Sequence, residues 1–224
     1  MGHSVFITAT DTDAGKTYIS SALLRALREA GKDVIGLKPI ASGNEGAAVN
    51  SDVAALLKAQ GMSESMDINL YSFDAALAPS QAAAAEGRNV DRQMLLDWCE
   101  QQSSVHDISL IEGVGGLMVP LAENYLLVNW IEDMPDCEVL LVVRAKLGGI
   151  NHALLTLDKL NRMGRPPRWV VINDADSEGE TMLRHHQAAL LPLLCESSQV
   201  ICLSQGAAAT DVLQAVVADI CSGK

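Results

Sequence analysis

Six short apolar runs recur along the chain, and stretches with apolar residues at helical spacing separate them. The runs are 4–9, 33–38, 107–112, 138–143, 168–173 and 199–203. None of them alternates apolar with polar residues, which is typical of strands buried on both faces of a parallel sheet. Helices are expected at 16–31, 50–60, 91–102, 151–164, 178–194 and 207–220. The pattern predicts an α/β fold with a doubly wound, mostly parallel sheet and helices on both faces.

Chain length favours one domain. The 224 residues suit a single α/β domain with a large core and barely permit two small ones, so we expect one domain over 1–224. The least regular segment is 42–90, which contains "SGNEG" and "ALAPSQ" as expected loops. Long insertions at the carboxyl edge of a sheet often carry substrate contacts, so we expect substrate specificity to reside there.

Net charge and cysteine spacing limit the partners and the cellular compartment that we expect for this protein. Sixteen Lys and Arg against 28 Asp and Glu give a net charge of −12, which opposes binding to nucleic acid or to an anionic membrane surface. No apolar run approaches the roughly 18 residues of a membrane span. The five cysteines form no C-x-x-C pair, as is typical of a reducing compartment. We expect a soluble cytoplasmic protein without nucleic-acid or membrane partners.

The stretch "TATDTDAGKT", residues 8–17, lies between the first expected strand and the first expected helix. It ends like the phosphate loop G-x-x-x-x-G-K-[ST], although Thr10 stands where the first glycine is usual. In such a loop backbone N–H groups bind phosphate oxygens, Lys16 reaches the β and γ phosphates and the Thr17 hydroxyl binds Mg²⁺. The alternative is that Gly-Lys-Thr merely begins a helix. The preceding strand favours the phosphate site, and with it a P-loop NTPase-like fold.

Two charged residues are expected at strand ends near this loop. Glu112 ends an apolar run and is followed by Gly113, Gly115 and Gly116. A carboxylate there can hold Mg²⁺ directly or through water, whereas the alternative is a solvated residue at a strand end. Lys38 precedes a proline-stiffened turn, and we interpret it as fixed positive charge in a site rather than as a surface lysine.

Two more stretches are ambiguous. Residues Gly148, Gly149, Ile150 and Asn151 open an expected helix and would present free N–H groups to an anion, although an ordinary strand-to-helix connection is the alternative. His185 and His186 are adjacent, without the i, i+4 spacing of helix metal ligands, so we expect both on a solvated helix face.

Five motifs occur in one order: "TDTDAGKT", "GLKPIASG" with Asp52 ten residues after Ser42, "IEGVGG", "KLGGINHALLT" and "VIND". Together, over residues 5 to about 174, they resemble the dethiobiotin synthetases, a family whose loop tolerates threonine at the position of Thr10. The resemblance implies ATP- and Mg²⁺-dependent ring closure of 7,8-diaminononanoate with CO₂ or bicarbonate, through a carbamate and a carbamic-phosphoric anhydride. It also implies a homodimer whose site is shared across the interface.

The resemblance further implies roles for individual residues. Lys38 and Lys16 would be catalytic. The nucleotide-binding residues would be Asp13, Ala14, Gly15, Lys16, Thr17, Tyr18, Asp52, Glu112, Gly113, Val114, Gly115, Asn173, Leu203, Ser204 and Gln205. The Mg²⁺ ligands would be Thr17, Asp52 and Glu112. The substrate-binding residues would be Thr12, Ser42, Gly148, Gly149, Ile150 and Asn151, of which the last four would act in the site of the other subunit.

The chain departs from the family pattern in places. In "LAPSQAA", Ala78 and Ser80 replace polar groups expected near the substrate chain, and Arg144 stands where a small neutral residue is expected. A partitioning ATPase of similar fold is disfavoured because residues 8–11 lack the second lysine usual in that class. A noncatalytic nucleotide-binding module would leave Lys38 without a role. A urea- or amide-forming ligase for a larger acid stays open.

Overall fold

A computed structural model describes the chain except for residues 1, 45, 48 and 223–224. Its centre is a six-stranded parallel sheet in the order β10-β9-β8-β1-β5-β2. The strands are β1 (His3–Ala9), β2 (Val34–Leu37), β5 (Ile108–Glu112), β8 (Glu138–Arg144), β9 (Trp169–Asn173) and β10 (Gln199–Leu203). Each strand coincides with one predicted apolar run, so the predicted sheet is confirmed.

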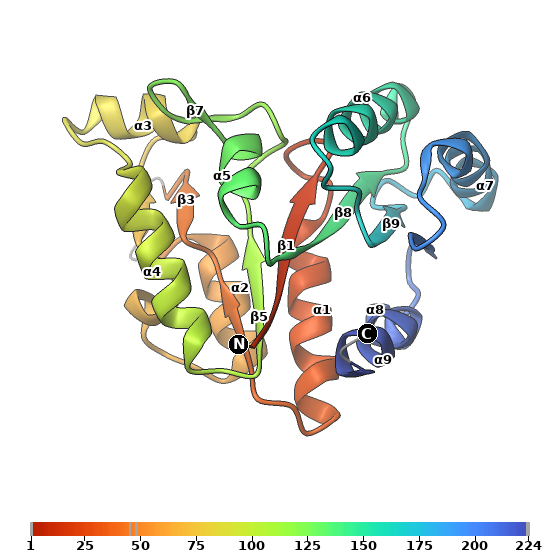
Figure 1. Cartoon of the computed structure of the whole chain (residues 1–224), viewed down its shortest axis with the longest axis horizontal. Coiled ribbons are helices and arrows are strands. Elements are labelled where there is room, and N and C mark those ends of the chain that lie inside the picture. Colours follow the sequence, from red (N-terminus) through yellow and green to blue (C-terminus); the bar gives the residue numbers. More distant parts are fainter. Residues whose placement is uncertain (1, 45, 48, 223–224) are drawn as a thin grey trace.

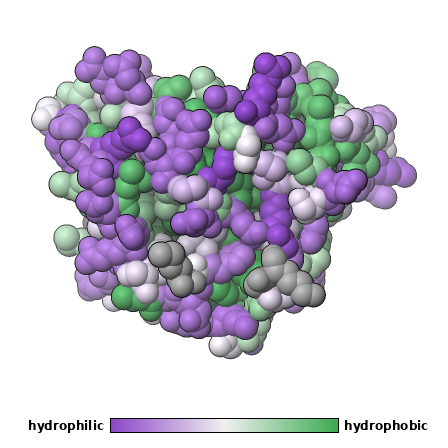
Figure 2. Space-filling view, viewed as in Figure 1, coloured by the Kyte–Doolittle hydropathy of each residue, from purple (hydrophilic) through white to green (hydrophobic). Residues whose placement is uncertain are grey.

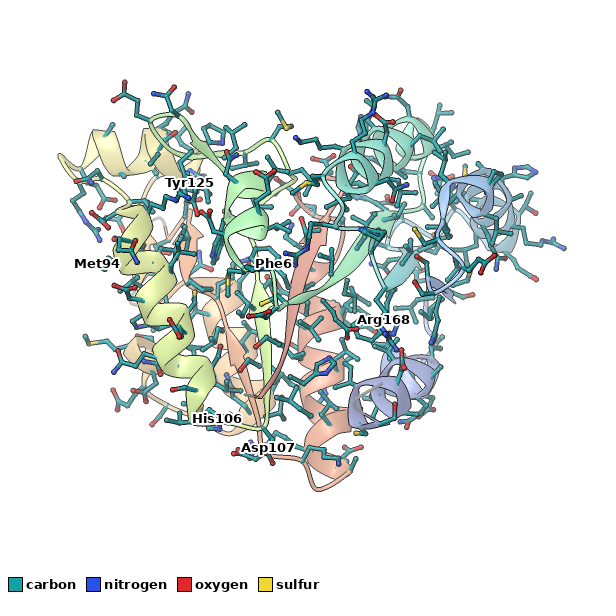
Figure 3. The ribbon with its side chains drawn as sticks, viewed as in Figure 1. Phe6, Met94, His106, Asp107, Tyr125 and Arg168 are labelled. Atoms are coloured by element: carbon teal, nitrogen blue, oxygen red, sulfur yellow. The ribbon has the colours of Figure 1, made fainter. Side chains whose placement is uncertain are left out.

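Helices cover both faces of this sheet, as predicted for a doubly wound fold (Figure 1). Behind the sheet in this view lie α1 (Lys16–Glu29) and α2 (Ser51–Gln60), with α8 (Ala209–Val212) and α9 (Gln214–Ser222) against α1. In front lie α5 (Leu127–Asp133) and α6 (Gly149–Arg162), and α7 (Glu180–Leu190) contacts α6. Helix α4 (Arg92–Ser104) leads into β5. Figure 3 shows Phe6 of β1 directed toward α5, where its ring meets Trp130 edge-on at 4.9 Å between ring centroids.

Several helix boundaries differ from the prediction. The helix expected at 151–164 begins two residues earlier, at Gly149. The helix expected at 178–194 ends at Leu190, and a 3₁₀ turn that contains Pro192 follows, because proline cannot continue the α-helical hydrogen bonding. The helix expected at 207–220 is divided into α8 and α9 at Leu213, whose ψ of 4° is not α-helical.

The segment 42–90 is more regular than predicted. Strands β3 (Ile40–Ser42) and β4 (Tyr71–Phe73) pair in parallel, and a short 3₁₀ helix, η1 (Ser65–Asp67), precedes β4. The expected loop "ALAPSQ" ends at Pro79, which begins α3 (Pro79–Ala85) because proline suits the first helical turn. The expected loop "SGNEG" includes residue 45, which lies outside the described residues. A further pair, β6 (Pro120–Ala122) and β7 (Tyr125–Leu126), is antiparallel.

A charge network lies at the amino ends of the central strands. Arg168 binds both carboxylate oxygens of Asp219 in α9, at 2.7 and 2.8 Å, and its guanidinium also lies 3.0 Å from Glu138. The Trp169 indole N–H donates to Asp219 at 3.0 Å, and His3 Nε2 lies 2.9 Å from Glu138. Figure 3 shows Arg168 between the sheet and the C-terminal helices. The network therefore joins three strands to the end of the chain.

The surface seen in Figure 2 mixes hydrophilic with hydrophobic residues, and hydrophobic residues gather at the upper right, in the part of the view that holds α6 and α7. Within the described part of the chain, no helix combines the length and the apolar character needed to cross a bilayer.

Candidate active site

A cavity of about 700 Å³ opens beside the loop that follows β1. Many of the predicted site residues line it, namely Thr12, Asp13, Gly15, Lys16, Thr17, Tyr18, Lys38, Ser42, Asp52, Val114 and Gly115. They come from the loop between β1 and α1, from α1 itself, from the residue after β2, from β3 and α2, and from the turn after β5. Residues distant in sequence thus meet at the carboxyl edge of the sheet, where ligands bind in open α/β folds.

The phosphate loop explains why Thr10 need not be glycine. The φ angle of Thr10 is not positive. Its N–H donates to Val142 O at 3.0 Å, which extends the pairing of β1 with β8. The left-handed positions are Asp13 (φ 57°) and Gly15 (φ 99°). At Gly15 a Cβ would also lie 2.3 Å from the amide nitrogen of Asn173. The backbone therefore requires glycine at 15 and tolerates a side chain at 10.

Lys16 lies at the start of α1, where backbone N–H groups have no partner within the helix. Its side chain is buried, and its Nζ donates to Gly115 O at 2.9 Å and to Asp11 O at 3.3 Å. Burial and the neighbouring Lys38 charge lower the pKa of Lys16 to about 8. A buried ammonium held only by carbonyl groups is well suited to bind an anion such as phosphate.

Lys38 is the centre of a buried ionic cluster. Its Nζ lies 2.6 Å from Glu112 Oε1 and 3.0 Å from Asp52 Oδ2, and it donates to Gly113 O at 3.2 Å. Burial opposes the charged form of Lys38, but the two carboxylates outweigh it and raise the pKa of Lys38. Burial likewise opposes ionisation of Asp52, and the Lys38 ammonium outweighs it, so the pKa of Asp52 is lowered. The cluster keeps a positive charge fixed beside the phosphate loop.

The oxygen atoms around Thr17 fit a magnesium ion. Glu112 is 1% exposed, its Oε2 has no hydrogen-bond partner, and its Oε1 accepts from the Thr17 hydroxyl at 2.6 Å. No group of three or more His, Cys, Asp or Glu side chains that could hold a metal occurs among the described residues. Mg²⁺ binds one or two carboxylates and takes its other ligands from phosphates and water, so the donor set of Thr17, Asp52 and Glu112 suits it.

An apolar wall makes up the rest of the cavity lining, and sequence reasoning missed most of it. It consists of Ala41, Ala76, Leu77, Ala78, Pro79 and Val119. The Ser42 hydroxyl donates to Leu77 O at 2.9 Å and so ties this wall to β3. Of the two substitutions noted in "LAPSQAA", Ala78 lines the cavity and Ser80 does not. Small apolar residues carry no chemical signature, which is why only Ala78 was singled out.

The predicted adenine-side residues lie next to the cavity rather than in its lining. Asn173 ends β9, and its side-chain amide donates to Ala14 O at 3.0 Å. Leu203 is its register partner on β10, and the exposed Ser204 and Gln205 follow. Ala14 and Gly113 are also outside the lining, as is Glu112, which reaches the site through Lys38 and Thr17.

The four residues predicted to bind substrate in the partner subunit lie apart from this cavity. Gly148 (φ 83°) precedes α6, and Gly149, Ile150 and Asn151 form its first turn. None of the four lines the cavity of about 700 Å³. Within one chain the structure therefore does not bring them together with the other predicted substrate-binding residues.

Comparison with known proteins identifies the family. A family model described as an AAA domain matches residues 3–204. The ATP-dependent dethiobiotin synthetase of Anaeromyxobacter dehalogenans is 40% identical over 177 residues, which cover 79% of this chain and 78% of that protein. The enzyme of the same name from Serratia marcescens is 38% identical, and the match covers 84% of this chain and 83% of that protein. The one from Escherichia coli O157:H7 is 35% identical, and the match covers 88% of this chain and 91% of that protein. The chain belongs to the dethiobiotin synthetase family.

Membership confirms the resemblance drawn from the motifs and the class of ATP-dependent ligase. A solved structure, the hydrogenase maturation factor HypB from Archaeoglobus fulgidus, superposes with a TM-score of 0.57. The two proteins are 14% identical, and the match covers 96% of this chain and 90% of the other. This likeness supports the P-loop NTPase-like fold alone.

Arg144, which departs from the family pattern, and His186, which was expected on a solvated face, both have defined surroundings. Arg144 ends β8 and forms a bidentate ion pair with Asp176, which follows β9. His186 is fully buried, so the predicted solvated position is wrong for it, whereas His185 is exposed as expected. His186 is on the face of α7 that carries Leu183 and Leu190, and this face packs toward α6 near Gly149.

Proposed function

We propose that this dethiobiotin synthetase family member converts 7,8-diaminononanoate, CO₂ and ATP into dethiobiotin, ADP and phosphate within one domain spanning residues 1–224. The observation that carries the proposal is the buried Lys38 ammonium, held between Glu112 and Asp52 next to the phosphate loop. Each step of this reaction gathers negative charge in a small volume. Preorganised positive charge is the most effective way for a protein to stabilise such transition states.

The chemistry needs no protein nucleophile. One amine of the diamine attacks CO₂ and loses a proton, which gives a carbamate. A carbamate oxygen then attacks the γ-phosphorus of ATP and ADP leaves, which gives a carbamic-phosphoric anhydride. The second amine attacks the carbonyl carbon of the anhydride and loses a proton, phosphate leaves with the bonding electrons, and the cyclic urea closes. Positioning of the reactants and electrostatic stabilisation account for the catalysis.

Lys16 and Lys38 supply the fixed positive charge in this proposal. The N–H groups of Asp13–Tyr18 and the turn Glu112–Gly115 hold the ATP phosphates, and Asn173 with Leu203–Gln205 faces the base. Thr17, Asp52 and Glu112 would hold Mg²⁺, which when bound neutralises phosphate charge. The orphaned, buried Glu112 Oε2 supports this assignment.

The diamine is proposed to bind between the phosphate loop and the apolar wall. Thr12 and Ser42 line the cavity together with Lys38 and offer hydroxyl groups to the amines. Ala76, Leu77 and Val119 present a surface suited to a methylene chain. The cavity therefore fits an aliphatic substrate whose amines lie near the hydroxyl groups and whose methylene chain lies along the apolar wall.

The carboxylate of the substrate is proposed to bind a second copy of the chain. Gly148–Asn151 open a 14-residue helix whose free N–H groups suit a carboxylate, yet they lie outside their own chain's cavity. The large apolar residues Leu147 and Leu155, 90% and 64% exposed, flank this helix start. Such residues support an interface here, so we assign the protein to a homodimer with shared sites.

Phosphate release from ATP, Mg²⁺ and bicarbonate, measured with and without 7,8-diaminononanoate, tests the proposal. Release that depends on the diamine, matched in mass spectrometry by a product heavier by CO₂ less water, is expected. Release indifferent to the diamine, without a cyclic urea, would overturn it and would direct the search to a ligase for a larger acid. Sedimentation with and without Leu155→Glu tests the interface, since a charge there should favour monomers.

A further inference from the structure

Strand β2 ends the central sheet and has a strand neighbour, β5, on one side only. The backbone groups on the other side of an edge strand have no ladder partner and must be satisfied in another way. Gly36 is buried within this strand. A Cβ at Gly36 would lie 2.4 Å from Leu24 Cδ1, so α1 packs directly against the backbone here. No side chain at 36 is available to hold the strand in place.

The side chain of Gln60 satisfies this free edge. Gln60 is the last residue of α2 and is 3% exposed. Its Nε2 donates to Gly36 O at 3.0 Å, and its Oε1 accepts from Gly36 N at 2.9 Å. One amide thus makes both hydrogen bonds that a residue of a neighbouring strand would make. The bonds fix the distance and the orientation of α2 relative to β2.

These two elements carry the residues that form the ionic cluster. Lys38 follows Gly36 by two residues, and Asp52 lies in the first turn of α2, where Asn50 caps the helix. The Lys38–Asp52 ion pair of 3.0 Å therefore bridges β2 and α2 at one end, and Gln60 bridges them at the other end of the helix. Gln60 follows Asp52 by eight positions along the helix, a rise of about 12 Å.

The chain beyond Gly36 is fixed by other groups. Lys38 N–H donates to Ile68 O at 2.8 Å, and the Asn69 amide donates to Lys38 O at 2.7 Å. Those bonds orient the Lys38 backbone relative to the segment before β4, whereas the hydrogen bonds of Gln60 to Gly36 join the backbone of β2 to α2.

We propose that Gln60 is a positioning residue for the reaction, because its amide sets the spacing of β2 and α2 and thereby holds the Lys38 ammonium against Asp52 and Glu112. The proposal rests on the proposed catalytic function of Lys38. Gln60 lies outside the cavity lining, so it acts through Lys38.

Gln60→Met tests the proposal, since methionine keeps the length and burial of the side chain but neither hydrogen bond. We expect kcat for diamine-dependent phosphate release to fall about tenfold to a hundredfold, the scale of a small misplacement of a catalytic group. The KM for ATP should stay within about twofold, because the phosphate loop is anchored on β1 and α1. Gln60→Glu keeps an acceptor for Gly36 N–H but, when ionised, sets a buried carboxylate oxygen against Gly36 O, so it should lose at least as much kcat as Gln60→Met.

Leu95→Ala is the matched control, because Leu95 is fully buried in α4 and makes no bond to β2. Melting temperatures by circular dichroism establish that every variant is folded at the assay temperature. The proposal is overturned if Gln60→Met and Gln60→Glu keep kcat within twofold of wild type, or if Leu95→Ala at a similar melting temperature loses as much kcat.

Lys38→Met separates this proposal from the function on which it rests. If Lys38→Met abolishes turnover while the Gln60 variants are unaffected, the positioning proposal fails and the function of Lys38 stands. If Lys38→Met retains wild-type turnover, the proposed catalytic role of Lys38 fails first, and the positioning proposal fails with it.

Discussion

The parallel strands of the central sheet begin at one edge, the amino edge, and end at the other, the carboxyl edge. The two edges differ in how their charged side chains are paired. At the amino edge, Arg168 meets Asp219 and Glu138 in a partly exposed network whose members bind one another. At the carboxyl edge, the Lys38 ammonium is buried, Glu112 keeps an oxygen without a partner, and Lys16 is held by carbonyl groups. At the amino edge each carboxylate has the Arg168 guanidinium as a partner, although Glu138 Oε2 and His3 Nε2 form no hydrogen bond among the described residues. At the carboxyl edge the unpaired Glu112 oxygen lies near two ammonium groups that line a cavity, so binding capacity is left for a ligand.

This difference indicates where stability and activity are determined. Groups left unsatisfied in a folded protein are costly, and proteins retain them mainly at functional sites. Substitutions at the carboxyl edge should therefore act first on turnover and nucleotide binding. Substitutions at the amino edge should act on the free energy of unfolding and leave turnover unchanged.

Replacement of Lys38 should have the largest effect. Lys38→Met removes the only ammonium that contacts both Glu112 and Asp52 among the described residues, and we expect kcat to fall about a thousandfold, the upper range for loss of one preorganised donor. Steady-state phosphate release measures this. A loss below tenfold would show that the buried cluster is not the centre of the chemistry.

Titration of Lys16 should produce the next largest effect. Phosphate binds the protonated amine, and the pKa of Lys16 is lowered to about 8, so ATP affinity should fall as the pH rises above 8. The expected loss is up to about tenfold per pH unit, because the charged fraction falls at that rate. Calorimetric titration between pH 7 and pH 9.5 measures the dissociation constant.

Lys16→Arg is the control for this titration, since guanidinium stays charged over the whole range. The variant should show a flat profile even if its affinity is lower. A wild-type profile as flat as that of the variant would contradict the assignment of Lys16 to phosphate binding.

Replacement of Arg168 should lower stability without lowering turnover. Arg168→Met leaves Asp219 and Glu138 without their common partner, and we expect a loss of about 2 kcal/mol in the free energy of unfolding. Urea unfolding measures the loss, and kcat below the melting transition should stay within about twofold. A large drop in kcat at unchanged stability would erase the distinction between the two edges.

The smallest effect expected is a pH dependence of Asp219. Its hydrogen bond from Arg168 lowers its pKa, so its contribution to stability is present above the ordinary carboxyl pKa of about 3.9 and is lost as the pH falls through the lowered value. Asp219→Asn should cost about 1 kcal/mol at pH 7, and the gap to wild type should narrow as the pH falls below about 4 toward pH 3. Urea unfolding at both pH values measures it, and a gap that widens on acidification would contradict the ion pair.

Sequence reasoning located the strands and the charged residues of the site because both have strong local signals. Apolar runs marked β1, β5, β8 and β9, and Gly-Lys-Thr marked the start of α1. The two- and three-residue strands β3, β4, β6 and β7 were missed because so few residues show no periodicity.

Other features depend on tertiary contacts that no local pattern contains. The apolar wall at Ala41 and Val119 and the hydrogen bonds of Gln60 appear only once the chain is folded. The burial of His186 did have a signal, since Leu183, His186 and Leu190 recur at helical spacing on one face. The prediction that both histidines lie on a solvated face did not take this spacing into account.

The backbone angles of the phosphate loop have a consequence for finding such proteins in genomes. The loop turns at Asp13 and Gly15, and Thr10 has an ordinary φ. A text pattern that demands glycine at the position of Thr10 would pass over this chain, although its loop has the required shape. Surveys that give more weight to the glycine at position 15 and to the strand before the loop would recover sequences whose phosphate loop has the same backbone shape but no glycine at the position of Thr10.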